Sequence, residues 1–231
     1  MPWERLPGAA RDIGIGADGS VWVLGTDNVP GGHSIFHWDR HTWVRVDGAA
    51  TAIAVGPDGQ PWVTNAAGNI FRRQGAWHML PGLAHDIGVG PNGSVWVIGT
   101  DNAEGGHGIY HWNGHGWDRV TGAGVRISVG PGGQPWVVNS QTNIYVRIRN
   151  NWLQLPGAAL DIGVGSGGDT WVIGTDAAGD GAGIYRWLDQ LDIPRWNRFD
   201  GAGWRIAVGP DGLAWVVSRS GGIFRWVVAF D

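Results

Sequence analysis

The chain has 231 residues, a formal net charge of −4 and no cysteine, and it contains 42 glycines, 17 tryptophans and 12 prolines. The lack of cysteine excludes disulfides, thiol nucleophiles and cysteine metal sites, and the small negative charge gives no electrostatic basis for binding nucleic acid or an anionic membrane. Frequent glycine and proline argue against long helices, whereas so many tryptophans can bury the apolar area that a packed globule needs.

The first residues, MPWERLPG, contain no basic region followed by an apolar stretch, which a secretory signal requires. The sequence also has no run of apolar residues long enough to span a bilayer. We therefore expect a protein without membrane insertion that is cytoplasmic, or is released by a non-classical route.

A strongly conserved internal motif recurs three times, at residues 6–23, 80–97 and 155–172, with spacings of 74 and 75 residues. A weaker relative of its second half lies between the copies, at residues 53–63, 127–137 and 206–216. The chain therefore divides into three tandem repeats, at about residues 3–76, 77–151 and 152–231, and each repeat holds an odd module followed by an even module. Six modules of roughly 40 residues match the size of β-propeller blades.

Each module shows four short strands separated by turns rich in glycine, proline and asparagine. In the second odd module the predicted strands cover residues 86–89, 94–98, 108–112 and 117–120, and residues 100–106 form a predicted loop. No segment has a helical period. The prediction is a single all-β domain over residues 1–231, a six-bladed β-propeller of four-stranded antiparallel blades.

The two ends of the sequence complement each other. The last module supplies three strands, ending near residues 222–227, and lacks a fourth, while residues 3–6 match fourth-strand segments such as residues 77–80. We therefore expect the amino-terminal strand to complete the last blade, which closes the ring and leaves no half-built sheet edge.

Most tryptophans recur at fixed positions of the repeat, which indicates packing between neighbouring sheets. Second strands hold Trp22, Trp62, Trp96, Trp136, Trp171 and Trp215. Fourth strands hold Trp3, Trp43, Trp77, Trp117, Trp152 and Trp196. Partial exposure of outer strands leaves the role of the fourth-strand set open between packing and binding.

The repeated pattern resembles the tectonin repeat over essentially the whole chain. In the second repeat it comprises Trp77, Pro81-Gly82, the I-x-V-G-x-x-G-x-x-W-V motif at residues 87–97, and residues 108–110. The resemblance implies a six-bladed propeller lectin that recognises glycans, such as O-methylated or bacterial lipopolysaccharide sugars, in innate defence. It also implies glycans on cell surfaces or bacterial polysaccharides as partners.

Odd modules differ from even modules by a long polar loop between the second and third strands, at residues 25–32, 99–106 and 174–181. The loops open on the same face as the segments that lead into Asp12, Asp86 and Asp161. Sugars need polar partners for their hydroxyl groups and an apolar surface, so we expect three related sites, one per repeat, with a wall from the next even module and with multivalent avidity. The candidate carbohydrate-binding residues are Asp12, Asp27, Asn28, Gly32, His33, Asp86, Asp101, Asn102, Gly106, His107, Tyr110, Asp161, Asp176, Gly181 and Tyr185.

Two alternatives stay open for these residues. Glycine with Asp-Asn is ordinary turn chemistry. The strand-leading positions Asp12, Ala52, Asp86, Arg126, Asp161 and Arg205 can also form a charge ring around a central channel. The alternative function is a protein-interaction scaffold, and exposed outer-strand tryptophans allow a homo-oligomer.

Other signals are set aside on context. The GxGxxG match at residues 88–93 enters a strand instead of a helix, which argues against a dinucleotide site. Histidines at positions 33 and 37 recur at 107 and 111 but are Ala182 and Arg186 in the third repeat, so we expect no metal site. No single pair of carboxylates breaks the symmetry as a glycosidase requires, so we expect no enzyme and no cofactor.

Overall fold

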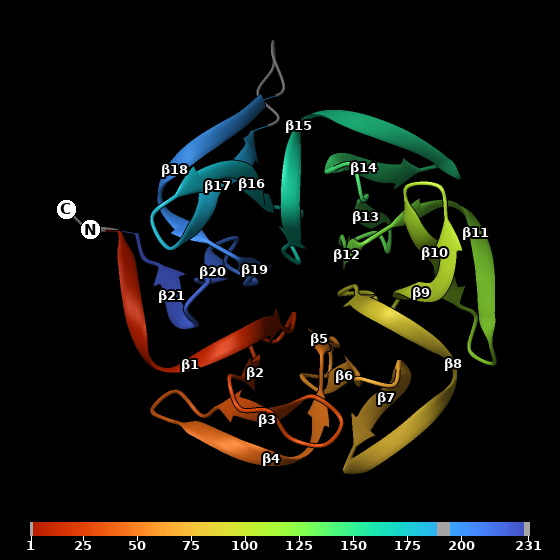
Figure 1. Cartoon of the computed structure of the whole chain (residues 1–231), viewed down its shortest axis with the longest axis horizontal. Coiled ribbons are helices and arrows are strands. Elements are labelled where there is room, and N and C mark those ends of the chain that lie inside the picture. The colour runs from red at the N-terminus through yellow and green to blue at the C-terminus, as the bar shows by residue number, and fades with distance from the viewer. Residues whose placement is uncertain (1, 189–194, 229–231) are drawn as a thin grey trace.

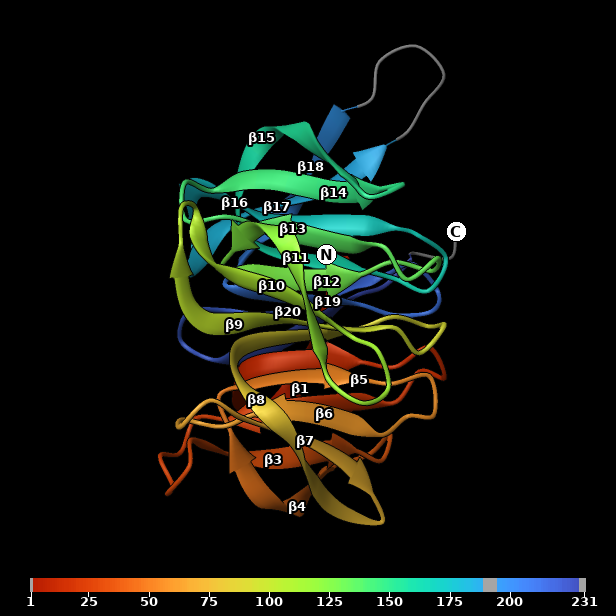
Figure 2. The same cartoon turned by 90° about the vertical axis from the view of Figure 1, so that its right-hand side faces the viewer.

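The computed structural model describes residues 2–188 and 195–228, and all regular secondary structure among them is β-strand. The strands form three seven-stranded antiparallel sheets arranged around a central axis (Figures 1 and 2). Within this described part, no helix has the length and apolarity needed to cross a bilayer.

Each sheet has one long strand in its middle. The first sheet runs β19 (Arg205–Val208), β20 (Ala214–Val217), β21 (Gly222–Trp226), β1 (Trp3–Ile15), β2 (Val21–Gly25), β3 (His33–Trp38) and β4 (Trp43–Ala50). The second runs β5 (Ala52–Val55), β6 (Pro61–Thr64), β7 (Asn69–Gln74), β8 (Ala76–Val89), β9 (Val95–Ala103), β10 (Gly106–Trp112) and β11 (Trp117–Gly124). The third runs β12 (Arg126–Val129), β13 (Pro135–Val138), β14 (Asn143–Ile148), β15 (Asn151–Val164), β16 (Thr170–Ala178), β17 (Gly181–Leu188) and β18 (Arg195–Gly203).

The long strands correct the prediction of six separate four-stranded sheets. The segment predicted to connect an even module to the next odd module is itself strand, so the modules merge in pairs. The first part of β8 pairs with β7 and its second part pairs with β9. A register shift and the positive φ of Gly82 (85°) let the strand bend between its two partners, as a β-bulge does.

The odd-module loops also differ from the prediction in two of the three repeats. Strands β9 and β10 extend through most of residues 100–106, and Asn102 pairs with His107 in the ladder. The third repeat has the same extended hairpin between β16 and β17. In the first repeat, β2 ends at Gly25 and the loop contains a single bridge between Val29 and Gly32.

The predicted closure by the amino-terminal strand is confirmed. Residues 3–6 of β1 pair antiparallel with β21, with Trp3 opposite Trp226 and Leu6 opposite Ile223. Around the axis, β5 contacts β1 and β8, β12 contacts β8 and β15, and β19 contacts β15 and β1. The inner strands therefore form a closed ring.

Second-strand tryptophans pack between modules, as predicted. Those of the odd modules are at most 7% exposed, and each indole donates to a glycine carbonyl in the next even module. The pairs are Trp22 with Gly59, Trp96 with Gly133 and Trp171 with Gly212, at 3.0–3.1 Å. Each buried indole therefore contributes apolar surface to the core, and its N–H bond fixes the orientation of the ring between two modules.

The fourth-strand tryptophans form an indole belt around the ring, which gives all six a packing role. Each Nε1 donates to a carbonyl of the outer strand in the preceding module, at 2.6–2.8 Å. The six donor–acceptor pairs are Trp3–Asp200, Trp43–Pro7, Trp77–Asp47, Trp117–Pro81, Trp152–Thr121 and Trp196–Pro156. The residue after each acceptor is a glycine with positive φ that lies against the indole, where a Cβ would crowd the ring.

Candidate functional site

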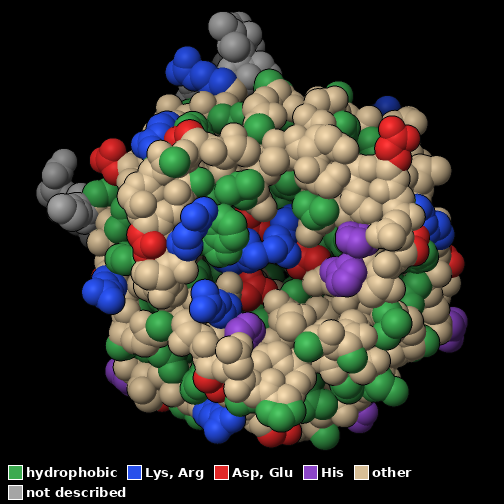
Figure 3. All heavy atoms as spheres, viewed as in Figure 1, with side chains coloured by type: hydrophobic (Ala, Val, Ile, Leu, Met, Phe, Trp, Pro, Cys, Tyr) green, Lys and Arg blue, Asp and Glu red, His purple; other side chains and the backbone are tan. Residues whose placement is uncertain are grey.

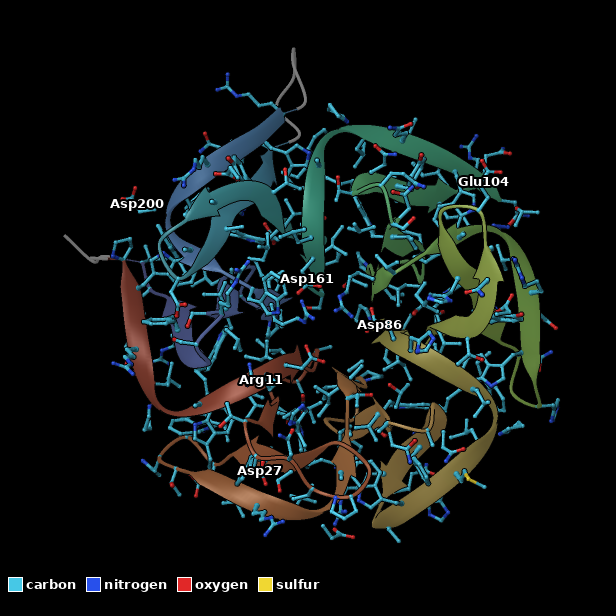
Figure 4. The ribbon with its side chains drawn as sticks, viewed as in Figure 1. Arg11, Asp27, Asp86, Glu104, Asp161 and Asp200 are labelled. Carbon is cyan, nitrogen blue, oxygen red and sulfur yellow. The ribbon has the colours of Figure 1, made fainter. Side chains whose placement is uncertain are left out.

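Three of the candidate carboxylates lie at the centre of the ring. Asp86 and Asp161 point toward the axis in Figure 4, and both are buried. Each of the three accepts a backbone N–H from the first strand of the next even module, namely Asp12 from Ile53 (3.0 Å), Asp86 from Ile127 (2.9 Å) and Asp161 from Ile206 (2.8 Å). These aspartates therefore connect neighbouring modules.

Two arginines complete a charge ring around a central cavity of about 80 Å³. Arg205 lies 3.9 Å from Asp12 and Arg126 lies 3.8 Å from Asp161, while the third equivalent position is Ala52. Charged side chains of both signs gather in this central hollow (Figure 3). The charge-ring interpretation thus fits the positions of Asp12, Asp86 and Asp161, and none of the three lines the pockets between modules described below.

Burial, with three acids against two arginines, perturbs the pKa values of these carboxylates. Burial raises the pKa of Asp12 to about 7, and Asp86 and Asp161 nearby add to the rise while Arg205 opposes it. Burial also raises the pKa of Asp86 to about 6, against the attraction of Arg126. The folded protein therefore holds protons on these groups that the unfolded chain releases near pH 4.

We expect Asp12→Asn to flatten the dependence of stability on pH. Because the pKa of Asp12 is higher in the folded state than its ordinary 3.8, the folded state binds more protons between pH 4 and 7. The free energy of unfolding then falls as pH rises through this window, by about 4 kcal/mol for a shift of this size, and not further above pH 7. Urea unfolding at pH 4 to 8 measures the slope; Asp200→Asn, an exposed control, should leave it unchanged. An equally steep slope in Asp12→Asn would contradict the expectation.

The carboxylates of Asp101 and Asp176 fold back onto the fourth strands of their own modules, β11 and β18. Asp101 lies 3.6 Å from Arg119, and Asp176 lies 3.5 Å from Arg198. The same arginines lie over Tyr110 and Tyr185, at 5.5 and 5.9 Å from the ring centroids. The second and third repeats therefore each bring together an aspartate, an arginine and a tyrosine, and the arginine was not among the sequence candidates.

In the first repeat the equivalent aspartate, Asp27, has different partners. Asp27 accepts hydrogen bonds from the backbone and the hydroxyl of Ser34, and these bonds lower its pKa. The Nδ1 atom of His33 lies 2.7 Å from the Asp27 carbonyl. Phe36 stands where the other repeats have tyrosine, so a hydroxyl is missing here. Asn28 and its counterpart Asn102 are exposed.

The remaining candidates have structural contacts. Gly32, Gly106 and Gly181 approach the carbonyls of Ala50, Gly124 and Gly203 so closely that a Cβ would clash. His107 packs against His85, with ring centroids 4.5 Å apart.

The repeated histidines serve aromatic packing. His37 lies against Trp22 and His111 against Trp96, at 4.6 and 4.4 Å between ring centroids. Arg186 takes the same place over Trp171 in the third repeat, at 5.6 Å. Stacking explains how arginine substitutes for histidine there. Within residues 2–188 and 195–228 no group of three acidic, histidine or cysteine side chains is placed to hold a metal ion.

Three equivalent pockets lie where an odd-module loop meets the following even module. The loop carbonyl accepts a backbone N–H from the even-module turn in every repeat: Ala66 to Gly31 (2.9 Å), Ser140 to Gly105 (2.8 Å) and Arg219 to Asp180 (2.8 Å). This bridge fixes the loop over the even module, which agrees with the expected wall. We call the three cavities beneath these bridges the loop pockets.

The loop pockets share one set of lining positions. Each has an alanine, a valine, an aromatic side chain, a belt tryptophan and a polar side chain at the even-module turn. In repeat order these are Ala49, Ala123 and Ala202; Val63, Val137 and Val216; Phe71, Tyr145 and Phe224; Trp77, Trp152 and Trp3; and Asn65, Asn139 and Ser218. The sequence candidates did not include these residues, although their regular recurrence was available as a signal.

The polar residues of the loop pockets are held in place by their own turns. The Oδ1 atom of Asn139 accepts the N–H groups of Gln141 and Asn143, and Asn65 makes the same pair of bonds. Ser218 accepts one N–H, from Gly222 at 3.0 Å. This leaves the side-chain amides of both asparagines as positioned donors.

The three loop pockets differ in size and polarity. Their volumes are about 220, 210 and 670 Å³ in repeat order. The second pocket adds a hydroxyl from Tyr145 and a carboxylate from Glu104. Glu104 lies in the turn between β9 and β10 (Figure 4). The third adds Arg5, Arg198 and Asp180, and the Asp180 carboxylate accepts hydrogen bonds from Ser220.

Curled antiparallel sheets closed around a channel, with repeated pockets between modules, define a β-propeller protein. Solved structures of low sequence identity share this architecture over nearly the whole chain. A structure titled "YCF48 bound to D1 peptide" has a TM-score of 0.61 at 14% identity and covers 99% of this chain and 98% of its own. The tectonin domain model matches residues 1–76 and 50–146, so the chain belongs to the tectonin family.

Two further structures agree on the fold alone. A streptogramin B lyase gives a TM-score of 0.60 at 16% identity and covers 96% of each chain. A calcium-binding protein, regucalcin from Agrobacterium tumefaciens, gives 0.64 at 16% identity and covers 96% of this chain and 91% of its own. No curated protein sequence matches the chain.

Proposed function

We propose that the protein is a lectin that binds glycans in its loop pockets. The observation that carries the proposal is the repetition of one pocket, with one set of lining positions, in all three repeats. Each seven-stranded sheet is then two four-stranded blades that share the long strand, which gives six blades in a single domain over residues 1–231.

The chemistry of the loop pockets suits a sugar ring. The aromatic side chain and the alanine offer an apolar surface for C–H groups or an O-methyl group, and the turn asparagine offers a fixed donor for a hydroxyl. Pockets of about 210 and 220 Å³ have room for one sugar unit, and the third, of about 670 Å³, for a longer oligosaccharide.

Three pockets on one ring suit repeated ligands on a surface, where modest single-site affinities combine into avidity. Cell-surface glycans or bacterial polysaccharides present such repeats, in agreement with a role in innate defence after release by a non-classical route. The proposal involves binding without catalysis, since a repeated site does not single out one reacting bond. It requires no cofactor, no nucleic acid and no membrane insertion.

The test is a glycan array that includes O-methylated mannose and fucose and bacterial polysaccharides. We expect selective binding that is lost when Ala49→Leu, Ala123→Leu and Ala202→Leu are combined, because the added side chains fill the pockets. Ala67→Leu, an exposed turn position, is the matched control and should retain binding. Retained binding in the triple variant would place the site elsewhere.

The loop carboxylates need a separate test. Combining Asp27→Ala, Asp101→Ala and Asp176→Ala removes the acid from each hairpin without filling a pocket. Lost glycan binding would assign the ligand to the loops, whereas retained binding would assign it to the loop pockets alone. A blank array with the wild type would favour a protein-interaction scaffold, and pull-down with candidate protein partners would follow.

A further inference from the structure

A further cavity, of about 830 Å³, lies between the even module of the second repeat and the odd module of the third. Its walls include Trp136, Val146, Ile148, Leu153 and Trp187. These residues belong to β13, β14 and β15, which are consecutive in the third sheet, and to β17, which follows β16 in the same sheet (Figure 1). We call this cavity the apolar groove.

The apolar groove opens on the face opposite the loop pockets. Strands β13 and β14 are antiparallel, so the turn at residues 139–142 and the hairpin at residues 149–150 lie at opposite ends of the sheet. Asn139 lines the second loop pocket, whereas Arg149 lines the apolar groove. A ligand in the groove therefore does not compete with one in a loop pocket.

The equivalent positions in the other even modules carry a charged cover over the second-strand tryptophan. Arg72 lies over Trp62 at 5.1 Å from the ring centroid and pairs with Asp58 at 3.0 Å. In the last even module, Arg225 lies over Trp215 at 5.7 Å and pairs with Glu4 at 2.6 Å. In both modules the tryptophan is at most 8% exposed.

The second repeat replaces this cover with apolar residues. Register places Val146 opposite Trp136, where Arg72 and Arg225 stand opposite their tryptophans. Leu153 pairs with Val146, in the place of His78 and Glu4. Leu153 and the nearby Ile148 are 51% and 49% exposed. Two substitutions toward apolar character, Val146 and Leu153, together with Ile148 leave apolar surface exposed at one place, as at a binding surface.

Trp136, which lines the groove, also has a donor without an acceptor. The Nε1 atom of Trp136 is buried and has no hydrogen-bond partner, unlike the second-strand indoles of the odd modules. An unpaired buried donor is costly, and a bound acceptor relieves the cost. Among the described residues that line the groove, the charged ones are Arg149 and Arg147, and the Arg147 guanidinium lies over Trp152 at 5.9 Å from the ring centroid. None of the lining residues is acidic.

From these observations we propose that the apolar groove binds an amphiphilic small molecule with an aliphatic body and an anionic, hydrogen-bond-accepting head, such as a medium-chain carboxylate. The volume suits one such ligand, the apolar walls suit its chain, and Arg149 and the Trp136 N–H suit its head. The site is independent of the proposed glycan binding.

The test is isothermal titration calorimetry with decanoate. We expect one molecule to bind per chain, and the double substitution Val146→Arg and Leu153→Glu, which recreates the arginine–glutamate cover of the last even module, to weaken binding at least tenfold. His78→Glu adds the same charge at the equivalent position of the first repeat and should bind decanoate like the wild type. Trp136→Phe keeps the apolar wall and removes the donor, and we expect a loss of about twofold to tenfold, the range for one hydrogen bond.

Several outcomes would overturn the proposal. They are no heat of binding with the wild type at millimolar decanoate, unchanged affinity in the double variant, or a stoichiometry above one that the double variant does not lower. A wild-type dimer in sedimentation that becomes monomeric in the double variant would also overturn it, because the groove would then be a contact between copies. Circular dichroism of each variant checks that the fold is intact.

Discussion

Arg205→Met is expected to destabilise the protein by about 2 kcal/mol at pH 8, because removing one partner of a partly buried ion pair leaves its carboxylate uncompensated. The charge ring would then hold three aspartates and one arginine, and Arg205 is the largest opposing influence on the raised pKa of both Asp12 and Asp161. Urea unfolding measures the change in the free energy of unfolding.

The destabilisation by Arg205→Met should shrink at pH 5. Asp12, with a pKa of about 7, and Asp86, with a pKa of about 6, are then largely protonated, so less negative charge remains in the channel. Arg5→Met, at an exposed position of β1, is the control and should change stability little at either pH. A loss that is the same at pH 5 and pH 8 would show that Arg205 acts through packing instead of charge.

Trp3→Ala is expected to cost about 2 to 4 kcal/mol and to speed unfolding, since the half-buried indole loses its apolar contacts and one hydrogen bond. Trp3 donates to the Asp200 carbonyl at 2.6 Å and packs edge-on against Trp226, with centroids 5.1 Å apart. Trp3 therefore contributes to the contact of β1 with β18 and to its contact with β21. Urea titration and the unfolding rate in urea measure the two effects.

Trp77→Ala is the matched control for Trp3→Ala. Trp77 makes the equivalent belt bond, to the Asp47 carbonyl at 2.8 Å, on a strand that continues covalently from its neighbours. Both variants should lose equilibrium stability, but only Trp3→Ala weakens the junction between the two ends of the ring. Equal unfolding rates for the two variants would contradict this role for Trp3.

The sequence was sufficient to predict the strands and the closure, because both depend on local periodicity. The alternation of side-chain types in residues 86–89, followed by a turn and the strand-forming residues 94–98, predicted two paired strands. The match of residues 3–6 to residues 77–80 predicted the pairing of β1 with β21. The continuity of β1, β8 and β15 was not predicted, since Pro-Gly reads as a turn signal. Here the glycine of that pair bends a strand that never leaves the sheet.

The candidate site was predicted only in outline. The meeting of an odd loop with an even wall was expected, and the bridge from Ser140 to Gly105 agrees with it. The lining residues were not predicted, because side chains such as Ala123 and Val137 carry no chemical signature in a sequence. The aspartates were ambiguous, since an acidic residue at the start of an inner strand reads equally well as a ligand or as a ring charge. Only the bond from Ile127 to Asp86 identifies its contact.

The indole belt bears on how such a ring is built up by duplication. Each belt link joins two modules through the same tryptophan, carbonyl and glycine, and the link that spans the chain ends is chemically the same as the five others. Since Trp3 pairs with Trp226 at the rim, a circular permutation that joins those strands and starts the chain at β8 or β15 preserves every link. The belt link is therefore the same between every pair of modules, so the chain can be opened at different modules, by evolution or by engineering, without the loss of a link.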